Sequence, residues 1–266
     1  MKSQRSLAYQ ALSALAVMAV VARAAHTVWR IKQSAALIRH STAFQALPPG
    51  ATASLLVVGD STAVGAGASS ADQSVAGLVA RDHPHVKIVN RAKNGARFAE
   101  IAGQIHGGER FDVILVLAGA NDVIRLTRLD SLRRDIARAA QTARARARLV
   151  IFMPPGNIGN SPFFFPPLSW LMARRTRAMH FLVRQAAASS GALFVSLYRD
   201  KADDLFVLQR DKFNAKDGLH PTSAGYRVWY EQLNEQAALA RRLAALRWQG
   251  ALKSSGNEPA DQAGVA

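Results

Sequence analysis

Five short, almost uninterrupted apolar runs recur along the chain and constrain its fold more than any other feature. A strand with one solvated face alternates apolar and polar residues, whereas a strand covered on both faces, as in a parallel sheet, is apolar throughout. Segments of helical length, rich in Ala, Arg, Leu and Gln, separate the runs, and this alternation predicts a doubly wound α/β sandwich. The expected strands are Ser54–Gly59, Val86–Asn90, Val113–Gly119, Leu149–Pro154 and Leu193–Tyr198.

The N-terminal segment indicates a membrane or an export route. Lys2 and Arg5 precede an uncharged run, Leu7–Ala22, which is slightly short for a spanning helix of about 20 residues. Three interpretations fit: a retained signal anchor, a signal peptide cleaved near Ala22-Arg23-Ala24, and an amphipathic interfacial helix. We therefore expect a chain that is membrane-associated or exported. Basic residues on both sides of the run leave the side of the membrane open.

These patterns divide the chain into four expected parts. Residues 1–30 would be the signal anchor or signal peptide, and residues 31–53 a basic juxtamembrane segment and linker in which Pro48-Pro49-Gly50 would end any preceding helix. Residues 54–248 would form one folded domain whose last helix runs from Tyr226 to about Trp248. Residues 249–266 have the composition of a disordered tail.

Charge and cysteine content narrow the classes of partner and chemistry. The formal net charge is +16, from 34 Lys and Arg against 18 Asp and Glu, which favours an anionic partner such as lipid headgroups. No nucleic-acid-binding motif accompanies this charge, so nucleic acid is not an expected partner. The absence of cysteine excludes disulfides, cysteine-based zinc sites and thiol nucleophiles, and no other metal-ligand spacing is visible.

The glycine-rich turn after the first expected strand either holds a phosphate or presents a nucleophile. A P-loop fails because Gly59 and Gly65 are one residue too far apart, and a dinucleotide fingerprint fails at Ser70. The nucleophile elbow G-x-S-x-G also fails, at Ala63. Ser61 nevertheless follows a buried strand at the head of a helix, where developing negative charge is favoured.

A serine nucleophile needs a base, and the stretch DGLH near the C-terminus offers one. His220 can take the proton of Ser61, and Asp217 can orient the imidazole. Functional groups in open α/β sheets gather where the strands end, so these residues and Asn121 are expected on one rim. Taken singly, Ser61 could be only a helix N-cap, and Asn121 and Asp217 could be ordinary turn residues.

Four blocks together resemble the SGNH (GDSL-type) hydrolase superfamily. They are GDST at Gly59–Thr62, a glycine at Gly95, GAND at Gly119–Asp122 and DGLH at Asp217–His220. They come in the family's order, and the resemblance extends from about Ser54 to Leu246. It implies a flavodoxin-like, three-layer α/β/α sandwich with a five-stranded parallel sheet. It also implies a serine esterase or lipase that uses no cofactor and no metal.

The resemblance gives each block a role. Ser61 would be the nucleophile and would donate its own backbone N–H to the oxyanion. Gly95, through its backbone, and Asn121, through its side-chain amide, would complete the oxyanion hole. His220 would move the proton and Asp217 would orient it. The block around Gly95 lacks the additional glycine and serine that the family often carries there.

The proline- and phenylalanine-rich stretch 154–175 has three interpretations. Phe163, Phe164 and Phe165 would belong to a buried loop, to an acyl-binding or lid segment, or to a membrane contact. The expected substrates are accordingly lipid or lysolipid esters, O-acyl or O-acetyl esters, and thioesters. The alternative function is a catalytically silent lipid- or envelope-binding protein with the same fold. The sequence makes no prediction of the oligomeric state.

Overall fold

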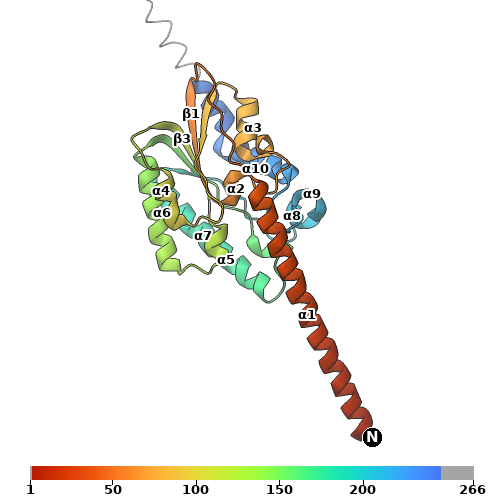
Figure 1. Cartoon of the computed structure of the whole chain (residues 1–266). Coiled ribbons are helices and arrows are strands. Elements are labelled where there is room, and N and C mark those ends of the chain that lie inside the picture. Colours follow the sequence, from red (N-terminus) through yellow and green to blue (C-terminus); the bar gives the residue numbers. More distant parts are fainter. Residues whose placement is uncertain (1, 247–266) are drawn as a thin grey trace, which may run out of the picture.

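A five-stranded parallel sheet forms the centre of the computed structural model, which describes residues 2–246 (Figure 1). The strand order is β2-β1-β3-β4-β5, so the predicted α/β class and the predicted number of strands are confirmed. The third and fourth strands begin and end two residues earlier than predicted, and the fifth ends at Phe194 instead of Tyr198. The strands are β1 (Ala53–Gly59), β2 (Val86–Asn90), β3 (Phe111–Leu117), β4 (Ala147–Phe152) and β5 (Leu193–Phe194).

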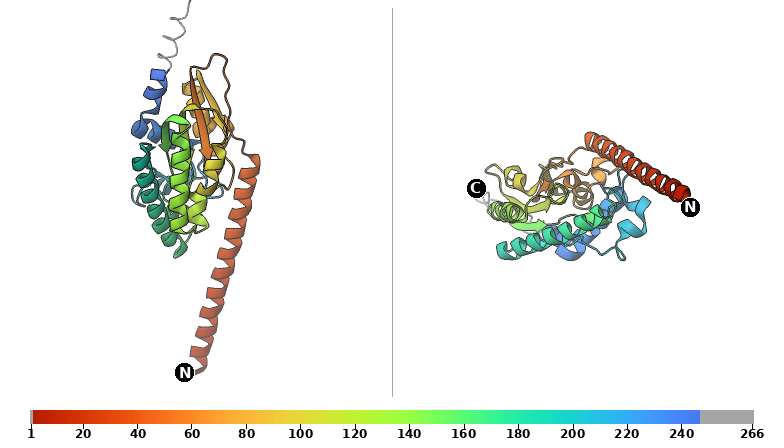
Figure 2. Two further views of the ribbon diagram at one scale, coloured as in Figure 1. Left: turned by 90° about the vertical axis from the view of Figure 1, so that its left-hand side faces the viewer. Right: turned by 90° about the horizontal axis from the view of Figure 1, so that it is seen from below.

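Helices cover both faces of the sheet, which confirms the three-layer sandwich (Figure 2). Successive residues of a strand point to opposite faces, and β1 shows this directly. Leu55 and Val57 belong to one buried cluster, and Leu56 and Val58 belong to the other. The first cluster includes residues of α3 (Val75–Asp82) and α10 (Ser223–Ala237), and the second includes residues of α4 (Phe98–Gln104), α6 (Leu129–Arg144) and α7 (Leu168–Ser190).

Short helices occupy the edge at which the strands end. Helix α2 (Ser61–Val64) begins two residues after β1, and α5 (Ala120–Ile124) begins three residues after β3. Because β1 and β3 are neighbours whose crossovers lead to opposite faces, this is the switch point at which open α/β sheets bind ligands. Four further short elements complete the loops: η1 (Ala71–Gln73), η2 (Ile158–Asn160), α8 (Leu205–Leu208) and α9 (Arg210–Phe213).

The N-terminal segment is one continuous helix, α1 (Lys2–His40), which projects well beyond the sandwich (Figures 1 and 2). It crosses the expected boundary at residue 30 without a break. The part Ser13–His40 is long and apolar enough to cross a membrane. After the helix, Ala46 forms an antiparallel bridge with Ile88 of β2 before the chain enters the sheet.

The predicted last helix, from Tyr226 to about Trp248, begins earlier in the structure and is interrupted once, and its expected end lies outside the described residues. Helix α10 begins three residues earlier, at Ser223, because the Thr222 side chain caps it by accepting from the Gly225 N–H (3.2 Å). It ends where Ala238 takes a left-handed conformation (φ 49°), and helix resumes over 239–246. The tail expected at 249–266 lies outside the described residues.

Candidate active site

The turn between β1 and α2 places Ser61 at the first position of a helix. Asp60 caps that helix: its side chain accepts from the Thr62 backbone N–H (2.9 Å) and from the Thr62 hydroxyl (2.8 Å). Before it, Gly59 has φ +153°, and the backbone carbonyl of Leu117 fills the space that a Cβ would need. The chain therefore leaves the sheet abruptly and presents Ser61 at the strand end.

A buried glutamine that sequence patterns did not indicate hydrogen-bonds to the backbone of this turn. Gln104 of α4 accepts from the Gly59 N–H (2.7 Å) and donates to the Gly59 carbonyl (2.9 Å), so that one amide side chain satisfies both backbone groups. Gln104 lies 45 residues away along the chain. No local pattern links the two positions, which explains why sequence reasoning could not find this contact.

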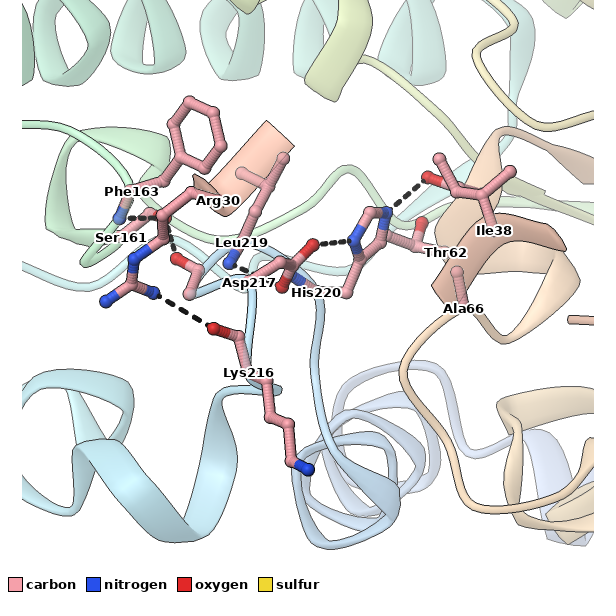
Figure 3. A network of polar contacts seen from close by, with 12 residues as sticks. Arg30, Ile38, Thr62, Ala66, Ser161, Phe163, Lys216, Asp217, Leu219 and His220 are labelled. Carbon is pink, nitrogen blue, oxygen red and sulfur yellow. Dashed lines mark hydrogen bonds and ion pairs between the residues drawn. The ribbon is translucent and has the colours of Figure 1, made fainter. Parts of the chain in front are cut away.

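Ser61, His220 and Asp217 lie in one hydrogen-bonded row. The Ser61 Oγ is 2.8 Å from His220 Nε2, and His220 Nδ1 is 2.6 Å from Asp217 Oδ2. All three residues are buried. One tautomer satisfies both contacts: Nδ1–H donates to the carboxylate while Nε2 accepts from the serine hydroxyl. Figure 3 shows the Asp217–His220 part of this row.

Asp217 is held in its ionised form. Burial would raise the pKa of its carboxyl group, but the hydrogen bond from His220 and the charge of that ring act in the opposite direction. The second carboxylate oxygen accepts from the backbone N–H groups of Leu219 (3.0 Å) and His220 (3.1 Å). The net result is a pKa for Asp217 below its usual value, which suits a group that must orient and stabilise an imidazolium.

The three residues expected to form the oxyanion hole line one cavity with His220. Ser61, Gly95 and Asn121 all face this space of about 200 Å³. Within residues 2–246, the backbone N–H groups of Ser61 and Gly95 have no protein acceptor. Asn121 donates one amide hydrogen to the Ala96 carbonyl (3.2 Å), which orients the amide and leaves its second hydrogen available.

Asp122 links the Asn121 turn to the loop that carries Gly95. Its Oδ2 accepts from the backbone N–H of Phe98 (2.9 Å), the first residue of α4. The carboxyl group is almost completely buried, and this burial raises its pKa above the usual value. The Asp122 and Asn121 side chains therefore tie adjacent positions of one turn to the loop on the other side of the cavity.

Two features of the cavity wall differ from what the sequence suggested. Phe163, Phe164 and Phe165 do not line the cavity that holds Ser61; Phe164 and Phe165 line a separate hollow beside it. Helix α1 contributes instead, through Ser34 and Ile38. The other apolar walls of the cavity include Ile124, Pro155, Ile158, Leu197, Phe206 and Trp229.

Among residues 2–246, no three His, Cys, Asp or Glu side chains are placed to hold a metal ion together. The hydrogen-bonded Ser61, His220 and Asp217 support nucleophilic chemistry, in which a histidine activates a serine hydroxyl beside a group of N–H donors.

Comparisons with known proteins relate the chain to lipases, acylhydrolases and esterases. A family model described as the GDSL-like lipase/acylhydrolase family matches residues 57–228. A GDSL-like esterase of Mycobacterium tuberculosis is 26% identical over 183 residues, which cover 65% of this chain and 57% of that protein. The matched part thus spans little more than half of the relative's length.

Solved structures share the fold. An alpha/beta hydrolase enzyme from the metagenome of Lake Arreo superposes with a TM-score of 0.56 at 18% identity, over 74% of this chain and 98% of that chain. A lipase/acylhydrolase from Enterococcus faecalis gives a TM-score of 0.52 at 19% identity, over 68% and 93% of the two chains. At these identities the likeness concerns the architecture alone.

Proposed function

The chain belongs to the GDSL-like lipase/acylhydrolase family, and from this premise we propose that it hydrolyses carboxylic esters through an acyl intermediate on Ser61. The observation that carries the proposal is the buried row in which Ser61 Oγ lies 2.8 Å from His220 Nε2 and His220 Nδ1 lies 2.6 Å from Asp217. A role of Ser61 as a helix cap would not explain its contact with His220 or the contact of His220 with Asp217.

In the proposed reaction, His220 Nε2 takes the hydroxyl proton as Ser61 Oγ attacks the ester carbonyl carbon. The oxygen of the tetrahedral intermediate receives hydrogen bonds from the N–H groups of Ser61 and Gly95 and from the Asn121 amide. His220 returns the proton to the leaving alcohol, and the C–O bond breaks. Water then attacks the acyl-enzyme, with His220 again acting as base, and releases the carboxylic acid.

The cavity supports an ester with a small or medium acyl group. Its volume of about 200 Å³ is below the roughly 300–1,000 Å³ that is usual for ligand pockets, and its walls are mainly apolar. Lysolipid esters, O-acyl or O-acetyl esters and thioesters of such acids are the proposed substrate classes. Because the matched esterase is covered over only 57% of its length, its name supports the reaction type and nothing finer.

We also propose that α1 keeps the enzyme at a membrane. Its segment before residue 26 has large apolar side chains that the sandwich does not cover: Val17, Val20 and Val21 are 62%, 67% and 60% exposed. Exposed side chains of this kind on a helix of spanning length favour lipid surroundings. The net charge of +16 would add attraction to anionic headgroups.

Hydrolysis of p-nitrophenyl acetate and butyrate by the full chain in detergent micelles tests the proposed function. Ser61→Ala and His220→Ala should each lower kcat by at least about a thousandfold, because nucleophile and base act as one unit. Ser189→Ala, which removes an exposed serine of α7, should leave kcat unchanged. Unchanged turnover in the two active-site variants, or no turnover by the wild type, would instead favour the silent lipid-binding alternative.

A further inference from the structure

Helix α1 has two parts with different surroundings. The side chains of residues 21–25 are exposed, whereas those of His26, Thr27, Arg30 and 33–38 are half-buried. Among the residues whose side chains are described, those of the last four turns are the ones that dock on the sandwich. Figure 1 shows this end of α1 beside α2, where the strands end, while the rest of the helix points away from the sandwich.

The docked part contacts the loop that carries the proposed catalytic acid. Arg30 Nη1 donates to the Lys216 carbonyl (3.5 Å), as Figure 3 shows. The same guanidinium occupies the space that a Cβ at Gly218 would need. Lys216 and Gly218 are the neighbours of Asp217, so α1 packs directly against the turn that holds the carboxylate.

The docked part also contacts the loop on the oxyanion side. The Asn94 side chain donates to the Ile38 carbonyl (3.5 Å), and Asn94 directly precedes Gly95. Helix α1 thus reaches from the Asp217 turn to the Gly95 loop. Ser34, between the two contact residues of the helix, and Ile38 itself face the cavity that contains Ser61 and His220. They lie four residues apart and so share one face of the helix.

Ile38 is placed to contact the acyl group of an ester bound at Ser61. In the proposed reaction the alcohol takes its proton from His220 and departs on that side of the tetrahedral carbon. Ile38 lies next to the loop that supplies Gly95, on the oxyanion side, and shares the cavity with the apolar Ile124, one helical turn after Asn121. An acyl group that remains bound to Ser61 and extends into this cavity would contact these two side chains.

We propose that the docked end of α1 is a wall of the substrate site and that Ile38, with Ser34 one turn before it, determines which acyl groups the enzyme accepts. The helix is thereby a specificity element as well as an anchor. This inference rests on the proposed function of Ser61 and adds to it a role for the N-terminal helix, which the family match over residues 57–228 does not include.

The test measures kcat/KM of the full chain in detergent micelles for p-nitrophenyl acetate, butyrate and hexanoate. Ile38→Trp and Ser34→Leu each fill the cavity and should lower the hexanoate-to-acetate ratio of kcat/KM roughly tenfold or more. Ile38→Ala enlarges the cavity and should raise the same ratio. Ile31→Ala, on the same helix with a side chain that is 53% exposed, should leave the ratio unchanged.

A second arm varies the alcohol in a series of acetate esters. The relative kcat/KM values for the different alcohols should be the same in all four variants as in the wild type. The proposal is overturned if the ratio of kcat/KM between hexanoate and acetate stays the same in Ile38→Trp, Ser34→Leu and Ile38→Ala. It is also overturned if kcat/KM falls equally for all substrates, or if it changes only in the alcohol series. A wild type that hydrolyses none of these esters refutes the proposed function, whereas an active wild type with insensitive variants refutes the α1 inference alone.

Discussion

The expected reactivity of Ser61 depends on the protonation of His220 and Asp217. His220 must stay neutral until it receives the serine proton, and Asp217 must stay charged to stabilise the imidazolium. Asp217 meets this requirement because three hydrogen bonds, one from the His220 ring and two from backbone N–H groups, outweigh the effect of its burial on the pKa. Asp60, which directly precedes Ser61, is fully buried. There the effect of burial outweighs the hydrogen bonds from Thr62 and raises the pKa of the carboxyl group.

A second histidine, His180, is buried for structural reasons. Its Nε2 donates to the carbonyl of Pro155 (2.8 Å), a residue of the cavity wall, and its ring packs against Phe194 and Tyr198. Burial lowers the pKa of His180 to about 4, a shift only partly opposed by the Pro155 hydrogen bond. His180 is therefore neutral at physiological pH and supports the loop after β4.

This lowered pKa predicts a loss of stability in mild acid. Between pH 6.5 and about 4 the unfolded chain binds a proton at His180 that the folded chain does not, so stability falls as the pH falls through this window. At pH 5 the loss attributable to His180 should be about 2 kcal/mol, from about 1.36 kcal/mol for each pH unit below 6.5. Urea unfolding of the full chain in micelles at pH 7.5 and pH 5 measures it.

The matched variants for this measurement are His180→Gln and His106→Gln. The side chain introduced by His180→Gln would keep an N–H donor near Pro155 but would not titrate, so the difference in unfolding free energy between the two pH values should shrink by the stated amount. His106 is exposed, and its replacement should leave that difference as in the wild type. The same pH dependence in His180→Gln and in the wild type would contradict the account.

Helix α4 links the turn before Ser61 to the turn that carries Asn121. Its first residue, Phe98, donates to Asp122, and its last, Gln104, hydrogen-bonds to the backbone of Gly59, two residues before the proposed nucleophile. Through Asp122 it also fixes the loop on which Gly95 lies. We interpret α4 as the rigid support of the oxyanion side, since its inner face is buried in the core through Phe98 and Ile101.

Removing the Asp122 contact should misplace the oxyanion donors without removing them. Asp122→Ala is expected to lower kcat roughly tenfold with little change in KM, because the donors act mainly on the transition state. Asp122→Asn should recover most of the loss, since a carboxamide oxygen still accepts from the Phe98 N–H. The kinetics of p-nitrophenyl butyrate hydrolysis report both effects.

Asp130→Ala serves as the control for this pair. Asp130 is an exposed acid in the first turn of α6, and its loss should not affect kcat. If Asp122→Asn were as slow as Asp122→Ala, or if the loss appeared in KM, Asp122 would not act by positioning the Gly95 loop.

Elements defined by local patterns were predictable, and elements defined by distant contacts were not. The continuous apolar runs predicted all five strands because strands buried on both faces need such runs. The break at Ala238 was missed because a left-handed alanine has no sequence signal comparable to glycine. The docking of α1 was missed for a different reason: an apolar N-terminal run predicts a membrane or an export route, and nothing in it indicates a face that packs against the sandwich.

At the scale of the whole molecule, the order of the blocks was more informative than any block alone. Serine, asparagine and histidine lie 60 and 99 residues apart at positions 61, 121 and 220, and the parallel sheet brings them to one edge. The sequence could therefore predict that these three residues line one cavity. It could not predict the walls, because they come from many separate segments whose paths depend on tertiary packing.

The central claim is that this fold activates Ser61 as a nucleophile, and covalent labelling with a fluorophosphonate probe tests it most directly. The full chain in detergent micelles is treated with the probe, and the labelled peptide is identified by mass spectrometry. One label is expected, on Ser61, and it should be absent in Ser61→Ala. Labelling should be at least about a hundredfold slower in His220→Ala and unchanged in Ser189→Ala. A chain that takes up no label, or a label on another serine, would contradict it.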